Sequence, residues 1–219
     1  MKKREAVVAN NTMVCAKEKK LYNVVKRVFD VVAAVVFLVL FFWVFIAVAI
    51  AIKLEDGGPV IYAHNRVGKG GKEFKFYKFR SMIIGADDVF EDIEDLNEVG
   101  DKLFKMKNDP RMTKVGRFIR KTSLDELPQI INIIKGEMSF VGPRPPLPRE
   151  VNEYDDYSKQ RLAVIGGLTC YWQISGRSNI DFKGMVELDL KYIRERGVIT
   201  DLKILFKTIP AVIKGDGAY

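Results

Sequence analysis

The sequence predicts an α+β protein that is mainly helical, with one N-terminal membrane helix followed by a small domain that contains a short β-hairpin and amphipathic helices. The first observation is Val31–Ile52, a run of 22 residues without a charged side chain, which is long enough to cross the hydrocarbon core of a bilayer. The second is a pair of alternating segments on either side of a Gly/Lys turn, which is typical of a hairpin. The third is a set of later segments with apolar residues at helical spacing.

The apolar run sets the domain organisation: a basic tail at 1–21, a membrane-inserted helix at 22–53 and a folded domain at 54–219. The run is too long for the apolar part of a signal peptide and no small-residue cleavage site follows it, so we expect it to be retained. A buried core helix is the alternative. Five lysines and arginines lie shortly before the run and four shortly after it, so the positive-inside rule places both flanks in the cytoplasm. We therefore expect a re-entrant helix, although the run contains no proline, glycine or serine that would bend it.

Composition narrows the chemistry of the folded domain. A net charge of +8 and a pI near 9.3 indicate an anionic partner, which is nucleic acid, an acidic membrane surface or a phosphorylated substrate. Cys15 and Cys170 have no paired spacing, which argues against a disulfide framework or a zinc site. His64 is the only histidine, which argues against a Ser–His or Cys–His triad. Carboxylates, lysines and metal-assisted chemistry remain.

Two segments after the membrane helix have simple structural interpretations. Val60–Tyr62 and Phe74–Arg80 read as strands joined by the turn Arg66–Lys72, whose glycines match neither a Walker nor a Rossmann pattern. Residues 86–101 carry eight acidic side chains around an apolar stripe. They predict a surface helix with a solvated acidic face, and an acidic metal cage is the alternative.

The most informative stretch is Arg117–Gln129, which ends with the neighbouring carboxylates Asp125 and Glu126. Ser123 and Glu126 have the spacing of a capping box, so we expect a helix that starts here and stops at Gly136. The carboxylates would then lie at a helix N-terminus, where anions and phosphates are favoured. Cations surround this stretch in the sequence at Lys114, Arg117, Arg120, Lys121 and Arg144. The set suits phosphoryl transfer, and an ordinary cap beside a solvated basic face is the alternative.

The C-terminal third predicts three helices, over Asp155–Arg161, Phe182–Arg196 and Asp201–Lys214. The last one carries lysines along the edge of an apolar face, so it either lies in the membrane interface or docks on the core. Gly166–Arg177 contains two glycines and an aromatic pair, and is either a buried strand or a loop that closes over a sugar or a base.

Five motifs in order carry a resemblance to a known family: Tyr77–Met82, Asn108–Arg111, Ser123–Gln129, Gly136–Pro145 and Trp172–Arg177. Over residues 22–219 the chain closely resembles the bacterial sugar transferases, the monotopic polyprenyl-phosphate phosphoglycosyl transferases, in their minimal catalytic form. The resemblance implies that 54–219 is a cytoplasmic catalytic domain. The chain departs from the family pattern in three places. Phe42-Trp43 stands where a Ser-Pro bend is usual, and His64 stands where glutamine is common. The loop reads Gly166-Gly167 and then Thr169-Cys170-Tyr171-Trp172 where Pro-Gly before Thr-Gly-Trp is frequent.

The resemblance implies an undecaprenyl-phosphate phosphosugar transferase that works in two steps. Asp125 would attack the sugar-linked phosphorus of a UDP-sugar and release UMP, and undecaprenyl phosphate would then take the sugar phosphate from Asp125. Asp125 and Glu126 would hold Mg²⁺. Residues that match phosphate- and substrate-binding positions are Lys78, Arg80, Arg120, Arg144 and Arg177. Asp189 matches a further family acid whose role the resemblance leaves open.

The partners implied are a UDP-sugar, undecaprenyl phosphate and bacterial inner-membrane lipid, on the cytoplasmic face of the cell membrane, with no nucleic acid. A second copy of the chain is a candidate partner in a homodimer. The product would start the assembly of a capsule, exopolysaccharide or O-antigen. Two alternatives stay open, which are a non-catalytic, membrane-anchored protein that binds anionic lipid or nucleic acid, and direct transfer in one step. No residue selects one sugar over another.

Overall fold

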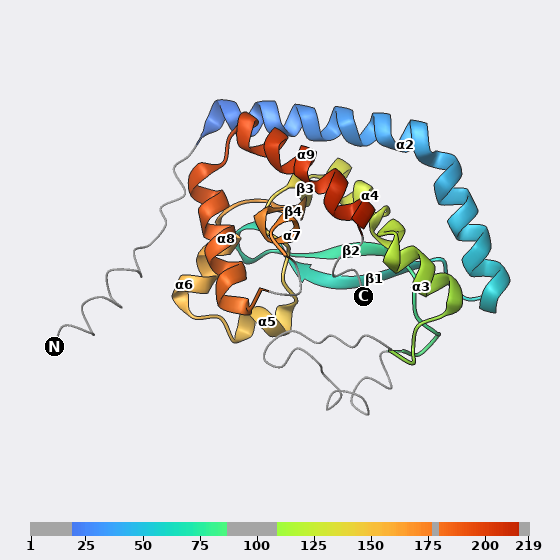
Figure 1. The fold of residues 1–219 in the computed structure, drawn as a ribbon. Coiled ribbons are helices and arrows are strands. Elements are labelled where there is room, and N and C mark those ends of the chain that lie inside the picture. The colour runs from blue at the N-terminus through green and yellow to red at the C-terminus, as the bar shows by residue number, and fades with distance from the viewer. Residues whose placement is uncertain (1–18, 87–108, 177–179, 215–219) are drawn as a thin grey trace.

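The computed structural model describes residues 19–86, 109–176 and 180–214. Its longest element is helix α2 (Lys20–Asp56), which runs along one edge of the molecule and bends partway, with the other elements inside the angle of the bend (Figure 1). The expected architecture is confirmed: the protein is mainly helical, with one long apolar N-terminal helix and a small β-hairpin. The observed helix is a few residues longer at each end than the predicted segment 22–53.

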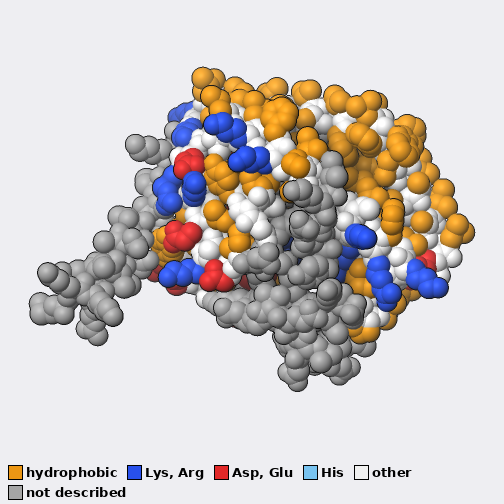
Figure 2. Space-filling view, viewed as in Figure 1, with side chains coloured by type: hydrophobic (Ala, Val, Ile, Leu, Met, Phe, Trp, Pro, Cys, Tyr) orange, Lys and Arg blue, Asp and Glu red, His pale blue; other side chains and the backbone are white. Residues whose placement is uncertain are grey.

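The apolar part of α2 is not a core helix. Its most apolar stretch has a mean hydropathy of 3.2, and only 11% of that stretch is buried inside the protein. Figure 2 shows hydrophobic side chains over the outer face of the molecule along this helix. A helix in the core of a soluble domain would bury most of such a stretch, so the surface of α2 fits insertion into lipid.

Both halves of α2 dock on the same domain. In the N-terminal half, Lys26 forms an ion pair of 2.7 Å with Asp201, and Ala34 belongs to an apolar cluster with Phe76. In the C-terminal half, Ile52 packs in a cluster with Phe79. The two ends of the helix are thus held beside one body, which is what a re-entrant helix requires.

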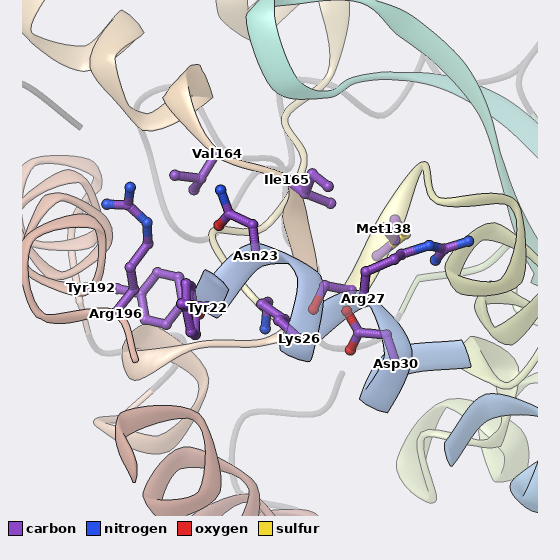
Figure 3. A pocket seen from close by; sticks show the side chains of 11 residues that line it. Tyr22, Asn23, Lys26, Arg27, Asp30, Met138, Val164, Ile165, Tyr192 and Arg196 are labelled. Atoms are coloured by element: carbon purple, nitrogen blue, oxygen red, sulfur yellow. The ribbon is translucent and has the colours of Figure 1, made fainter. Parts of the chain in front are cut away.

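A small cavity of about 50 Å³ marks the N-terminal attachment of α2 (Figure 3). Asp201, at the start of helix α9 (Val198–Lys214), accepts hydrogen bonds from the Tyr22 hydroxyl at 2.9 Å and from Lys26. Tyr192 also donates to Asp201, at 2.9 Å. Because these groups satisfy one another, the cluster anchors the helix.

Helix α2 bends although it contains no proline, and one of its side chains bonds to its own backbone. The Trp43 indole N–H donates to the backbone carbonyl of Leu40 at 3.0 Å. A side chain that enters the backbone hydrogen-bond ladder is one of the recognised causes of a helix kink. The rings of Phe37 and Phe41 pack beside this point, with centroids 4.6 Å apart. We therefore expect Trp43 to contribute to the bend.

Two small sheets form the centre of the domain. Strands β1 (Ile61–Val67) and β2 (Glu73–Phe79) form the predicted antiparallel hairpin, in a register that pairs Ile61 with Phe79. Gly70 and Gly71 at the turn adopt positive φ, which confirms a structural turn. Strands β3 (Met138–Val141) and β4 (Gly166–Thr169) form a parallel pair, so the segment left open between strand and loop begins as a strand.

The remaining elements are short helices, apart from α8 and α9. Their bounds are α3 (Lys114–Lys121), η3 (Leu124–Glu126), α4 (Gln129–Lys135), α5 (Pro148–Asn152), α6 (Asp156–Lys159), η4 (Gln160–Ala163), α7 (Tyr171–Ile174) and α8 (Phe182–Glu195). The three predicted C-terminal helices are confirmed. The predicted acidic helix in 86–101 lies almost wholly outside the described residues.

Helix α9 packs on the core and also exposes an apolar face, and these are the two placements that the sequence left open. Ile204 is fully buried in a core cluster with residues of α8 and β3. Leu202, Phe206 and Ile209 are exposed on the other side of the same helix, which lies beneath the N-terminal part of α2 (Figure 1). The helix is therefore docked by one face and presents an apolar face beside the membrane helix.

Candidate active site

A cavity of about 1340 Å³ collects most of the residues that the sequence singles out. Its polar wall is made by the hairpin, by η3 and by the Pro-rich loop after β3, and its apolar wall by residues of α2 and α9. The predicted site residues that line it are Lys78, Arg80, Arg120, Asp125, Glu126 and Arg144. The volume exceeds the usual range for a single small ligand, about 300–1,000 Å³.

The local structure around the two carboxylates differs from the prediction. Ser123 has a left-handed backbone, with φ of 58°, and its side chain makes no cap hydrogen bond. This conformation follows the end of α3 and is incompatible with the extended backbone of an N-cap. The chain then forms the 3-10 turn η3, and α4 begins only after Pro128. The predicted capping box is therefore wrong, whereas the predicted stop at Gly136 is confirmed by its φ of 85°.

Side chains, rather than a helix end, compensate the charge of the carboxylates. The Lys78 ammonium, from β2, lies 3.2 Å from Asp125 Oδ2 and 3.1 Å from Glu126 Oε1. Arg144 Nη1 lies 3.4 Å from the same Glu126 oxygen. One lysine therefore bridges both acids, and an arginine from a different segment reaches the second acid.

The surroundings of Asp125 and Glu126 shift the pKa values of the two carboxyl groups in opposite directions. Burial, followed by the nearby Glu126 charge, raises the pKa of Asp125 against the opposing effect of Lys78, and only 4% of the residue is exposed. Burial acts in the same direction on Glu126, but Lys78 and Arg144 together lower its pKa to about 2. Neighbouring acids whose pKa values are pushed apart usually have different roles. Glu126 stays ionised, and Asp125 is the more basic carboxylate.

Arg120 and Arg80 contribute differently. Arg120 lies at the end of α3, where its Nη1 contacts Met112 Sδ at 3.4 Å, and its charge acts to lower the pKa of Asp125. Arg80 is engaged elsewhere: its Nη1 donates to Asp56 at 2.6 Å and its Nε donates to the Pro59 carbonyl at 2.7 Å. Arg80 therefore fastens the end of α2 to the hairpin beside the cavity.

Asp189 does not line the cavity. Asp189 is 1% exposed and forms a buried ion pair with Arg161. Arg161 also donates to the Tyr154 hydroxyl at 2.8 Å and reaches the Arg144 carbonyl at 3.4 Å. Asp189 thus lies behind the loop that carries Arg144, and Arg177 lies outside the described residues.

The donor set fits a divalent cation that arrives with a substrate. Among the described residues there is no group of three or more His, Cys, Asp or Glu side chains that could hold a metal ion. Asp125 and Glu126 still offer two adjacent carboxylates in the cavity. Mg²⁺ is commonly held by one or two carboxylates together with substrate phosphates, so these residues suit it.

Sequence reasoning missed two residues of the cavity, His64 and Arg66. Arg66 Nε donates to His64 Nε2 at 2.9 Å, and Arg66 Nη1 donates to the Pro145 carbonyl at 2.9 Å. The signal was present, because Arg66 opens the Gly/Lys turn, but a basic residue at a turn is usually solvated. Only the packing of β1 against the Pro-rich loop brings it to the site.

The sequence is similar to a known family of proteins. The family model described as bacterial sugar transferase matches residues 21–215. The galactosyl transferase CpsE of Streptococcus agalactiae serotype III is 45% identical over 91% of this chain and 44% of that protein. The undecaprenyl-phosphate galactose phosphotransferase of Salmonella typhimurium is 43% identical over 92% of this chain and 43% of that protein.

A shorter relative is the exopolysaccharide production protein ExoY of Rhizobium meliloti, which is 46% identical over 89% of this chain and 88% of that protein. The chain thus spans less than half the length of the first two relatives and most of the third.

Proposed function

The chain belongs to the bacterial sugar transferase family, and from this premise we propose that it transfers a sugar-1-phosphate from a UDP-sugar to undecaprenyl phosphate and releases UMP. The observation that carries the proposal is the buried Asp125 carboxylate, bridged to Glu126 by Lys78. Relatives named for galactose phosphate transfer to undecaprenyl phosphate and for exopolysaccharide production support the reaction and its place at the start of glycan assembly.

In the first step, an Asp125 oxygen attacks the sugar-linked phosphorus and the bond from that phosphorus to the bridging oxygen of UMP breaks. The ionised carboxylate needs no general base, and its raised pKa increases its basicity, which favours nucleophilic attack. In the second step, the phosphate oxygen of undecaprenyl phosphate attacks the same phosphorus. The Asp125 carboxylate leaves, and the lipid diphosphosugar forms.

The neighbouring charges suit both steps. Esterification removes the charge of Asp125, and Lys78 then remains paired with Glu126 at 3.1 Å. Arg144 and Arg120 line the same cavity and can stabilise charge on the transferred phosphoryl group and on the leaving UMP. When bound, Mg²⁺ held by Asp125 and Glu126 would neutralise diphosphate charge as a Lewis acid.

The apolar wall of the cavity favours a lipid acceptor over a soluble one or a nucleic acid. Phe29 and Phe37 of α2, with Leu202, Phe206 and Ile209 of α9, line the cavity that also contains Asp125. An acceptor with a phosphate head and an isoprenoid tail can place its head at the carboxylate and its tail between the two helices. A non-catalytic lipid anchor would not require a buried carboxylate in that cavity.

The direct test uses purified protein in nanodiscs with Mg²⁺, undecaprenyl phosphate and a panel of UDP-sugars. We expect UMP release and a lipid-linked product with at least one sugar. With donor alone, the two-step reaction gives up to one UMP per enzyme and a phosphosugar bound to the protein, whereas one-step transfer gives neither. Absence of UMP release with every sugar would instead support a binding protein without chemistry.

We further propose that both ends of α2 face the cytoplasm and that Trp43 maintains this topology. Reporters at residues 5 and 219 are expected to be inaccessible from outside the cell, because both halves of α2 dock on one domain. Trp43→Phe keeps an aromatic ring but removes the N–H that donates to Leu40, so it should expose the N-terminal reporter in a fraction of molecules. Accessibility can be measured by labelling with a membrane-impermeant reagent.

The matched control for this experiment is Phe42→Leu, which changes a neighbouring side chain that has no hydrogen-bond donor. It should leave both reporters protected. External labelling of either end in the unmodified protein would show a spanning helix. Unchanged protection in Trp43→Phe would mean that packing of the two halves, without Trp43, suffices for the bend.

A further inference from the structure

The guanidinium of Arg66 lies in the wall of the active-site cavity and is held entirely by neutral groups. His64 Nε2 and the Pro145 carbonyl each accept a hydrogen bond from it at 2.9 Å, and it lies 5.4 Å from the centre of the Phe76 ring. Among the described residues, no carboxylate lies within 4 Å of this guanidinium and its Nη2 donates no hydrogen bond. Arg66 therefore has a fixed orientation and, among the described residues, no direct ion pair.

No ion pair compensates Arg66 directly. Burial, and next the positive charge of Arg144, lower the pKa of Arg66 to about 10, against the opposing charges of Glu150 and Glu126. Glu126 is paired with Arg144, and the Glu150 carboxylate accepts a hydrogen bond from Leu147 N at 2.8 Å. Arg66 is half-buried in the cavity wall, so an anion bound in the cavity would supply the direct partner that neither acid provides.

His64 is suited to hold Arg66 because it stays neutral. Burial, followed by the charges of Arg66 and Lys78, lowers the pKa of His64 to about 3. The neutral imidazole can therefore accept from Arg66 Nε, whereas a protonated one could not. A glutamine side chain would offer an equivalent acceptor oxygen, and a hydrocarbon side chain would offer none.

We propose that Arg66, oriented by His64, binds a phosphate group of a substrate in the active-site cavity. This assignment rests on the proposed function, whose two substrates both carry phosphate: the nucleoside diphosphate donor and the lipid phosphate acceptor. Lys78 and Arg144 are already engaged with Asp125 and Glu126, whereas Arg66 has an uncommitted terminal nitrogen. The guanidinium geometry is suited to phosphate oxygens.

The alternative role of Arg66 is to clamp the Pro-rich loop, since Val67 N also donates to the Pro146 carbonyl at 2.9 Å. Binding of UMP and of uridine separates the two roles, because uridine lacks only the phosphate. In Arg66→Gln, loss of a charge-assisted hydrogen bond should raise the Kd of UMP by roughly 10- to 100-fold. The Kd of uridine should change by less than about twofold, within the scatter of a surface substitution.

A second measurement identifies the source of the phosphate. If Arg66 binds the donor, Arg66→Gln raises the Kd of UMP. If it binds the acceptor, the same variant raises only the KM for undecaprenyl phosphate. The proposal would be overturned if Arg66→Gln raised the Kd of UMP and of uridine equally. It would also be overturned if neither the Kd of UMP nor the KM for undecaprenyl phosphate changed.

The His64 variants and the unmodified protein complete the experiment. His64→Gln should retain the UMP affinity and His64→Leu should lose part of it, because only the glutamine keeps an acceptor for Arg66 Nε. Thermal unfolding should confirm that each variant is folded. If Arg66→Gln does not fold, Arg66→Lys provides a second variant, which retains the charge. Failure of the unmodified protein to release UMP would count against the proposed function. Normal release by the unmodified protein, with neither the UMP-to-uridine ratio nor the KM for undecaprenyl phosphate changed in Arg66→Gln, would count against this inference alone.

Discussion

Asp125→Asn is expected to reduce UMP release by at least about 10³-fold, because the amide has the shape of the carboxylate but cannot form the acyl phosphate. The substitution leaves Lys78 paired with Glu126 at 3.1 Å, so the rest of the site should persist. Release can be followed with donor alone and with both substrates. UMP release should be lost in both assays, because Asp125 reacts with the donor before the acceptor takes part.

The same variant should be at least as stable as the unmodified protein at neutral pH. Burial raises the pKa of Asp125, which means that folding disfavours its ionised form. The protonated carboxyl of Asp125 therefore adds to the stability of the folded protein. This contribution is complete below the ordinary Asp pKa and is lost as the pH rises through the raised pKa of the folded state. A neutral asparagine avoids that loss, so the melting temperature of Asp125→Asn should equal or exceed that of the unmodified protein at pH 7, and the difference should shrink on acidification.

Asp156→Asn is the matched control for this prediction. It makes the same chemical change at a side chain that is 93% exposed and 3.6 Å from Lys159. Activity and melting temperature should both be unchanged. If Asp125→Asn retained more than a few per cent of UMP release, the covalent step would be excluded. If it lost activity only because it melted at the assay temperature, the loss would carry no mechanistic information, and the melting curve reveals this case.

Removal of divalent cations is expected to stop UMP release almost completely, and addition of Mg²⁺ should restore it. The cavity offers two adjacent carboxylates, both bridged by Lys78, so the diphosphate of the donor has to complete the coordination. Binding of the cation should therefore be weak without nucleotide and tighter with it. Mn²⁺ can report this binding independently of catalysis through its effect on water proton relaxation.

Glu126→Gln tests whether the second carboxylate takes part in that binding. It should raise the concentration of Mg²⁺ needed for half-maximal activity, because one of the two anionic ligands is lost, while Asp156→Asn should leave it unchanged. Full activity in excess chelator would contradict a requirement for the metal. An unchanged Mg²⁺ dependence in Glu126→Gln would remove this residue from the metal site.

Much of the fold can be predicted from the sequence because the relevant signals are local. The uncharged run Val31–Ile52 predicts a lipid-exposed helix from its length alone, and the structure leaves its apolar stretch largely unburied. Alternation on both sides of a glycine turn predicts the hairpin β1–β2, and apolar spacing predicts α8 and α9. Each of these features depends on residues within one or two turns or strands of one another.

Local signals failed where the chain changes direction. The Ser-x-x-Glu spacing predicted one continuous helix, yet Ser123 takes a left-handed conformation that ends α3 and delays the next helix until after Pro128. The parallel pair β3–β4 also went unpredicted, because its pairing partners are 28 residues apart, as between Met138 and Gly166. Neither outcome is encoded in a short window of residue types.

The sequence by itself determined the membrane helix, the hairpin and the residue types that carry the proposed chemistry, with Asp125, Glu126, Lys78 and Arg144 all recognised in advance. Tertiary structure alone decided which charges meet. It brought Lys78 to two acids 47 and 48 residues away, committed Arg80 to Asp56 and left Arg66 in the cavity wall. The reason is physical: backbone hydrogen bonds and side-chain periodicity act over a few residues, whereas the pairing of buried charges depends on how distant segments pack together.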